Sequence, residues 1–432
     1  MSKTTFTILV SLLIIAIVGG AIWFFYFYQG GQKQFDFGVT IKDFLPFGRL
    51  AEPDQTRDSA GKEGQETPDK ISYGVLRQLA IGPVAGFTSM KGTTTVTARY
   101  LERHTGHIYD IGVLDQKPKR VSGTTIPRVY EALFVDSGKS VLIRYLGDDN
   151  ATIETYLATV PKIPESGAEV GLPAATSVAQ AGEPAVSANA GQAGELTGVF
   201  LPQNISDIST SPNGKSFFYI LSSAGGAVGI VGVPGGGTGR QIFSFPFSEW
   251  LSSWTNEKTI TLTTKPSGGI AGYAYALNPI DKSFVKIFGN VAGLTTLLSP
   301  DRKYMLYGSS GETGMLSAIY DLKNKSFKTL SVSTLPEKCA WAKTSDKIYC
   351  GVPAEFPFGK YPDVWYKGQA SFSDSLWSID PASTISEVVS DLAIPDGTQF
   401  DVIKPALSAD GKYLLFINKK DLSLWSYDLG SI

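Results

Sequence analysis

His104 and His107 are the residues whose type and spacing most directly suggest chemistry, because two imidazoles three positions apart can bind one metal ion. They are the only 2 histidines in the 432-residue sequence. Two ligands do not complete the four-coordinate site of structural zinc, and Gly106 between them suits the positive φ angle of a hairpin turn. We therefore expect a turn here, with no metal and no cofactor.

Acidic residues such as Asp301 and Asp410 stand singly in short turn-like segments. Calcium requires several clustered oxygen ligands, so turn formation explains these carboxylates better than metal binding does. The sequence also lacks the G-x-S-x-G motif of α/β-hydrolases, and no sialidase-like arginine cluster can be assigned. We assign no catalytic residue and predict that the chain is not an enzyme.

A segment from about residue 353 to residue 372 is unusually aromatic for a loop. Tryptophan and tyrosine are enriched in binding hot spots, so we take its rings as candidate contacts for a partner. The alternative is that the rings fold back to plug a channel or cover one face of the fold. The candidate residues are Phe356, Phe358, Tyr361, Trp365 and Tyr366.

Cys339 and Cys350 are the only cysteines, and they flank the turn-like run from Thr344 to Lys347. They could face each other across a hairpin, where a disulfide would fit an oxidising compartment. Two buried free thiols would have the same spacing, so both alternatives stay open.

The N-terminal part predicts a membrane anchor. Residues 6–28 are almost wholly apolar, which is long enough to cross a bilayer as a helix, and residues 1–5 form a short tail before it. The aromatic cluster from Trp23 to Tyr28 suits the membrane interface and argues against a cleaved signal peptide. No lipid-attachment cysteine follows. A tail this short usually stays in the cytoplasm, so we expect a single-pass cell-membrane protein with an extracytoplasmic C-terminal part.

The composition of two segments predicts linkers. Residues 29–70 include a charged stretch without aromatic residues from Leu50 to Lys70, which predicts a flexible tether. Residues 161–197 are rich in Ala, Gly, Ser and Pro and predict a disordered insertion. The net charge of -2 provides no field that would attract nucleic acid.

The elements that must position these residues come from a repeat. Each unit has an apolar run, a turn-like tetrad ending in lysine and a second apolar run. The lysines recur about every 44 residues when the insertions near 161–197 and 353–372 are left out of the count. A degenerate seventh unit lies near residue 95, and residues 254–258 and 343–347 depart from the pattern. The turn lysines are Lys139, Lys215, Lys258, Lys303, Lys347 and Lys412.

A third strand ends some 13 to 20 residues beyond the lysine, as at Leu277, and a fourth short apolar run follows it. Four strands per period are typical of a propeller blade. The chain ends just after the third strand of its last unit, so we expect residues 73–80 to supply the fourth strand and close the ring.

The segments Ser211-Pro212-Asn213-Gly214-Lys215 and Ser408-Ala409-Asp410-Gly411-Lys412, each followed by an apolar strand, resemble the repeat of TolB-type propellers. The resemblance covers most of residues 71–432 and implies an all-β fold, a single propeller, which we expect to have seven four-stranded blades. It implies no single function, because periplasmic scaffolds and the propeller domains of peptidases share the repeat.

These features together predict a membrane-tethered extracytoplasmic propeller that binds a protein or another envelope component. The alternative is a carbohydrate-active or other hydrolytic enzyme that uses acidic residues in the axial funnel of the propeller.

Overall fold

The computed structural model describes residues 72–73, 75–92, 96–162 and 193–431. The chain divides into two compact units, Met1–Phe44 and Leu45–Ile432, and every described residue belongs to the second. The predicted tail 1–5, membrane helix 6–28 and tether 29–70 therefore lie outside the described residues. Within the described ranges, no helix has both the length and the apolar character needed to cross a membrane.

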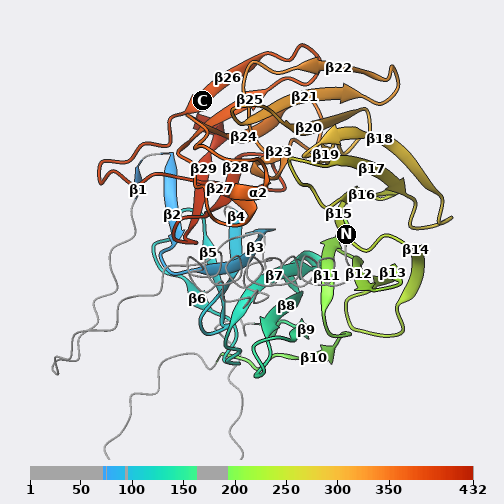
Figure 1. Ribbon diagram of the computed structural model, residues 1–432. Coiled ribbons are helices and arrows are strands. Elements are labelled where there is room, and N and C mark those ends of the chain that lie inside the picture. The colour runs from blue at the N-terminus through green and yellow to red at the C-terminus, as the bar shows by residue number, and fades with distance from the viewer. Residues whose placement is uncertain (1–71, 74, 93–95, 163–192, 432) are drawn as a thin grey trace, which may run out of the picture. The chain divides into compact units, whose positions relative to one another are not determined.

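The described residues form seven antiparallel sheets, which follow one another along the chain as the blades of a β-propeller (Figure 1). Blades 1 to 3 consist of β3 (Val84–Lys91), β4 (Val96–Glu102), β5 (Ile108–Gly112) and β6 (Lys119–Arg120); β7 (Val129–Val135), β8 (Ser140–Leu146), β9 (Ile153–Thr159) and β10 (Thr197–Phe200); and β11 (Ile205–Thr210), β12 (Phe217–Ser223), β13 (Gly226–Gly232) and β14 (Arg240–Phe245).

Blades 4 to 6 have the same four-stranded order. They consist of β15 (Trp250–Asn256), β16 (Thr259–Thr264), β17 (Ala271–Leu277) and β18 (Phe284–Ala292); β19 (Thr295–Leu298), β20 (Tyr304–Ser310), β21 (Met315–Asp321) and β22 (Ser326–Thr329); and β23 (Cys339–Trp341), β24 (Ile348–Pro353), β25 (Asp374–Ile379) and β26 (Ser386–Ser390).

Blade 7 joins strands from both ends of the described chain. It contains β27 (Val402–Leu407), β28 (Tyr413–Asn418) and β29 (Leu424–Asp428), and its fourth strand is β2 (Leu76–Ala80), which lies antiparallel to β29 with Gln78 opposite Trp425. Figure 1 shows the blue strand β2 beside the red strand β29. A two-residue strand, β1 (Ser72–Tyr73), extends this sheet. The predicted closure of the propeller is confirmed.

The repeated lysine turns connect the first and second strands of the blades. In blade 5, the Ser299 hydroxyl donates to Asp301 Oδ1 at 2.6 Å, and the same oxygen accepts from the Lys303 backbone N–H at 3.0 Å. The turns at residues 211–216 and 408–413 repeat both bonds. The side chain at the third position thus satisfies turn donors that no strand partner reaches.

The two departing tetrads occupy the same place, because residues 254–258 join β15 to β16 and residues 343–347 join β23 to β24. The degenerate unit near residue 95 lies between β3 and β4. The number of blades is therefore seven, as predicted.

Antiparallel pairing fixes which connections share a face. The lysine turns and the links between third and fourth strands lie at one face, whereas the links between second and third strands and between blades lie at the other. The predicted insertion at residues 161–197 falls between β9 and β10, and residues 163–192 of it lie outside the described residues. At its described end the Gly123 N–H donates to the Gly194 carbonyl at 2.8 Å, and β10 begins at Thr197. Backbone pairing with blade 1 orders these last residues.

Candidate functional site

The aromatic insertion, residues 354–373, lies between β24 and β25 and so belongs to the face opposite the lysine turns. It contains one helical turn, α2 (Asp363–Tyr366). Tyr361 and Trp365 are each only 1% exposed and lie in a hydrophobic cluster with residues of blades 1, 5 and 7, such as Val96 and Leu415. Neither ring is accessible to a partner in this conformation.

Of the other three rings, two pack against the protein and one is exposed to solvent. Phe356 is half-buried, and its ring centre lies 5.1 Å from that of Tyr361. The Tyr366 hydroxyl donates to the Glu337 carboxylate, and burial, followed by that carboxylate, raises the pKa of Tyr366 well above its usual value. Phe358, by contrast, is 107% exposed relative to an isolated residue. The structure thus places one candidate contact residue in solvent and folds the other four against the propeller.

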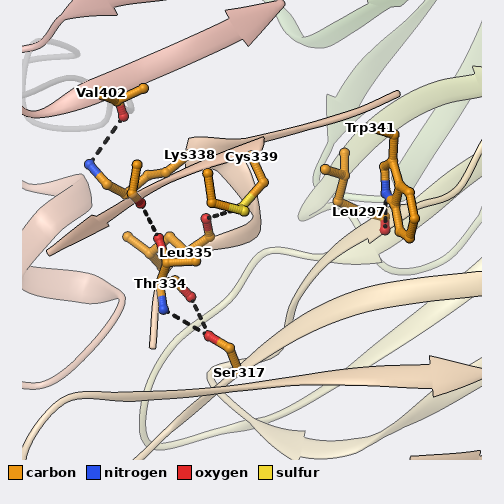
Figure 2. The surroundings of a disulfide bond; sticks show 10 residues. Leu297, Ser317, Thr334, Leu335, Lys338, Cys339, Trp341 and Val402 are labelled. Atoms are coloured by element: carbon orange, nitrogen blue, oxygen red, sulfur yellow. Dashed lines mark hydrogen bonds between the residues drawn. A yellow bond between two sulfur atoms is a disulfide. The ribbon is translucent and has the colours of Figure 1, made fainter. Parts of the chain in front are cut away.

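A buried ion network lies beside the insertion. Lys338 follows Pro336 in a short 3-10 turn before β23, and its side chain is fully buried. Its Nζ lies 2.7 Å from Asp374 Oδ2, forms a second ion pair with Asp401 and donates to the Val402 carbonyl at 3.1 Å. Figure 2 shows Lys338 pointing toward Val402 next to the cysteine strand. One buried cation is thus shared by two buried carboxylates, which would be costly to bury without a positive partner.

Asp401 connects this network to the insertion. Its carboxylate accepts from the Trp365 indole N–H at 3.2 Å and from the Phe372 backbone N–H at 3.1 Å. Burial acts to raise the pKa of Asp401, but Lys338 outweighs it and holds the pKa below its usual value. Because the anionic form is retained, these charge-assisted bonds hold the helical turn and the end of the insertion in place.

Lys419 contacts the same tryptophan from β28's end. Its Nζ donates to the Trp365 carbonyl at 2.6 Å and lies 4.2 Å from the ring centre. Burial lowers the pKa of Lys419 to about 8, although Asp401 opposes the shift.

The insertion also binds the loop between β16 and β17. Asp363 accepts from the Ser267 hydroxyl at 3.0 Å and from the Gly268 backbone N–H at 2.7 Å. A Cβ atom at Gly268 would lie 2.3 Å from the Tyr361 carbonyl oxygen, so this approach requires glycine. The loop between β20 and β21 lies equally close, since a Cβ at Gly314 would be 2.8 Å from the Phe356 ring.

Three large apolar side chains are exposed on or next to these segments. Ile270 directly precedes β17, Leu316 is on β21 and Phe358 is on the insertion. We call this set the apolar rim: Ile270, Leu316 and Phe358.

Charged groups also converge along the inner strands. Glu131 on β7 lies 3.0 Å from Lys404 on β27 and 2.6 Å from Arg144 on β8. Arg144 also donates to the Ile205 carbonyl of blade 3, and Asp207 on β11 accepts from the Ser252 backbone N–H of blade 4. Blades 7, 2, 3 and 4 are thereby connected by polar side chains near the axis.

The pKa values of the two inner carboxyls are shifted in opposite directions. Burial acts to raise the pKa of Glu131, but Lys404 and Arg144 outweigh it and hold the pKa at about 2. Burial raises the pKa of Asp207 to about 6, against the lowering effect of its bonds to Ser252. Such divergent carboxyls are a pattern found at catalytic sites and also in structural ion-pair networks.

Our sequence analysis missed these inner charges, although the repeat contains a signal for them. Glu131, Asp207 and Lys404 each stand eight positions before the turn lysine of their unit. A fixed distance from the turn places them at equivalent points of their first strands, and hence near the common axis. The buried set Lys338, Asp374 and Asp401 shows no comparable periodicity.

The histidine segment is a hairpin turn, as predicted. It joins β4 to β5, and Gly106 has a φ of 73°. His107 Nε2 lies 2.8 Å from Arg120 and 3.1 Å from Thr125. Across the residues that the structure describes, no three His, Cys, Asp or Glu side chains are grouped for a metal ion.

Cys339 lies directly opposite Cys350 in the β23–β24 pair, and a disulfide joins them. Both residues are buried in a cluster with Leu306 and Ile348. The disulfide is adjacent in sequence to Lys338, so it fixes the strand from which the buried cation extends.

Comparison with known proteins adds only fold-level likeness. No protein-family model and no curated protein matches the chain. Similar solved structures include an oligogalacturonate lyase in complex with manganese, with a TM-score of 0.45, 9% identity and coverage of 81% of this chain and 98% of that one. TolB from Acinetobacter baumannii has a TM-score of 0.40 and 12% identity over 79% of this chain and 78% of that one. Hydrazine synthase from Kuenenia stuttgartiensis has a TM-score of 0.46 and 12% identity over 85% and 99%.

The chain is a seven-bladed β-propeller. That assignment rests on its own sheets and on the closure of blade 7. A propeller fold does not by itself separate catalysis from binding.

Proposed function

We propose that this chain is a membrane-tethered, extracytoplasmic β-propeller that binds a protein partner and does not catalyse a reaction. The observation that carries the proposal is Phe358, a fully exposed ring on an insertion fixed to the propeller by buried ion pairs. An aromatic side chain has only two side-chain torsions, so it offers a large contact area at a low cost in conformational entropy, and aromatic residues are enriched in hot spots.

The apolar rim extends this contact surface. Ile270 is exposed on the loop between β16 and β17, and Leu316 is exposed on β21, directly after the loop between β20 and β21. We propose that these side chains act with Phe358 as one contact surface, because exposed apolar patches mark protein-binding sites.

Two further features support the proposed location of the propeller outside the cytoplasm. The apolar residues 6–28 fit a spanning helix, and the disulfide between Cys339 and Cys350 fits an oxidising compartment. Together they favour a propeller outside the cytoplasm.

The test is affinity purification of the full chain from native membranes, with Phe358→Ala compared with wild type. Phe327→Ala is the matched control, because Phe327 is also exposed but lies on the outer strand β22. We expect one protein to copurify in stoichiometric amounts with wild type and the control, and to rebind when both components are pure. Retention of that protein by Phe358→Ala would refute the proposal.

A hydrolytic enzyme is the second candidate, and the inner carboxyls favour it. With pKa values of about 6 and about 2, Asp207 could supply a proton while Glu131 stays ionised. Both oxygens of Glu131 are already paired with cations, which weakens it as a base or nucleophile. Turnover of an oligosaccharide or ester that Asp207→Asn abolishes would establish this candidate over the binding module.

A further inference from the structure

A cleft of about 710 Å³ opens at blade 2, away from the aromatic insertion. It is lined by the ends of β8 and β10 and the residues that follow them, by Glu154 on β9, and by residues 125–128, which link blade 1 to β7. Its volume is in the range of small-molecule sites. The cleft belongs to other blades than the apolar rim and does not depend on the proposed function.

Aromatic side chains form one wall of the cleft. Phe200 is 62% exposed, and its ring centre lies 5.0 Å from that of Tyr156, which stands directly opposite it in the sheet. Tyr145 also lines the cleft and is half-buried. An exposed phenylalanine held by a second ring provides a flat apolar surface without needing to move.

Planar polar groups border this wall in two hydrogen-bonded pairs. The Gln203 amide donates to Glu154 at 2.7 Å. Arg128 donates to Asp148 at 2.8 Å and to the Gly147 carbonyl at 2.8 Å. Carboxylate, amide and guanidinium groups together offer both acceptors and donors.

We propose that this cleft binds a neutral saccharide chain. Sugars present apolar C–H faces that pack on aromatic rings, and hydroxyl groups that both donate and accept hydrogen bonds. The charged groups of the lining comprise one cation, Arg128, and two anions, Asp148 and Glu154, so an acidic sugar would meet a net negative charge. The exposure of Phe200 leaves one side open, which suits a chain longer than a single sugar.

The experiment is calorimetric titration of the full chain in lipid nanodiscs, which avoids detergents with sugar headgroups. The probes are the tetramers of N-acetylglucosamine and of glucose, with tetragalacturonate as the anionic comparison. We expect at least one neutral tetramer to bind, and roughly a tenfold or greater loss of affinity in Phe200→Ala. Gln203→Ala is expected to weaken binding as well.

Phe327→Ala on β22 serves as the matched control and should bind like wild type. Equal melting temperatures of the variants would show that lost binding is not lost folding, as expected for exposed side chains. The proposal is overturned if neither neutral tetramer binds, if tetragalacturonate binds more tightly, or if Phe200→Ala binds as wild type does.

Discussion

Lys404 on β27 and Glu131 on β7 form an ion pair at 3.0 Å although 273 positions separate them in the chain. The pair joins blade 7 to blade 2 past the intervening first blade. Both side chains therefore lie where the inner strands converge, and Arg144 shares the same carboxylate.

Replacing this carboxylate should destabilise the propeller. Glu131→Gln leaves Arg144 and Lys404 without their common anion, and we expect the free energy of unfolding to fall by about 3 kcal/mol at pH 7. The folded pKa of about 2 lies below the ordinary 4.5, so the stabilisation is complete above pH 5 and disappears as pH falls toward 2. Denaturant unfolding at pH 7 and pH 3 should show the difference from wild type shrinking at the lower pH. An equal difference at both would contradict the ion-pair explanation.

Asp207 should behave in the opposite way. Its folded pKa of about 6 exceeds the ordinary 3.8, so its ionised form destabilises the fold, and the cost grows as pH rises from 4 to 6. We expect Asp207→Asn to raise the free energy of unfolding by about 1 to 3 kcal/mol at pH 8 and to have little effect near pH 4. Thermal melting at both pH values measures this, with Glu312→Gln on an exposed turn as control. A destabilised variant at pH 8 would be inconsistent with the raised pKa.

Lys338 should be the most sensitive buried position. Lys338→Met leaves Asp374 and Asp401 as uncompensated anions, with an expected loss of about 3 to 5 kcal/mol at neutral pH. Protonation of the two carboxyls should restore part of this loss at low pH. Limited proteolysis should also cleave the insertion faster, because Asp401 would hold Trp365 less firmly. Lys367→Met, an exposed lysine of the same insertion, should change neither readout.

The disulfide leads to one prediction about the free energy of unfolding and one about the cellular compartment of the propeller. Breaking it with Cys339→Ala and Cys350→Ala opens a loop of 11 residues, which should cost about 3 kcal/mol of unfolding free energy. In membranes prepared under thiol-blocking conditions, mass mapping of unreduced peptides should recover the two cysteines joined. Two blocked thiols in that map would argue against an oxidising compartment.

The repeat was predictable because its determinants are local. Ser299 and Asp301 satisfy their own turn, so the same residue types mark the same turn wherever a blade needs one. Counting strands per unit predicts that the last blade needs a fourth strand and that residues 73–80 supply it, and the structure places β2 (Leu76–Ala80) there.

The behaviour of the insertion was not predictable in the same way. Its aromatic content was evident, but the direction of each ring depends on partners far away in sequence. Trp365 is buried because Asp401 and Lys419 satisfy its polar groups, whereas Phe358 has no such partner among the described contacts and remains in solvent. No pattern within residues 353–372 distinguishes the two.

Because β2 pairs with β29, blade 7 can be completed only after both of these strands have been made. During synthesis β2 emerges first and its partner last, so the first strand must wait unpaired until nearly the whole described chain has been made. The propeller can therefore close only after β29 has been made. Loss of β29 would remove the strand that joins β2 to β28 and would leave an open seam in blade 7.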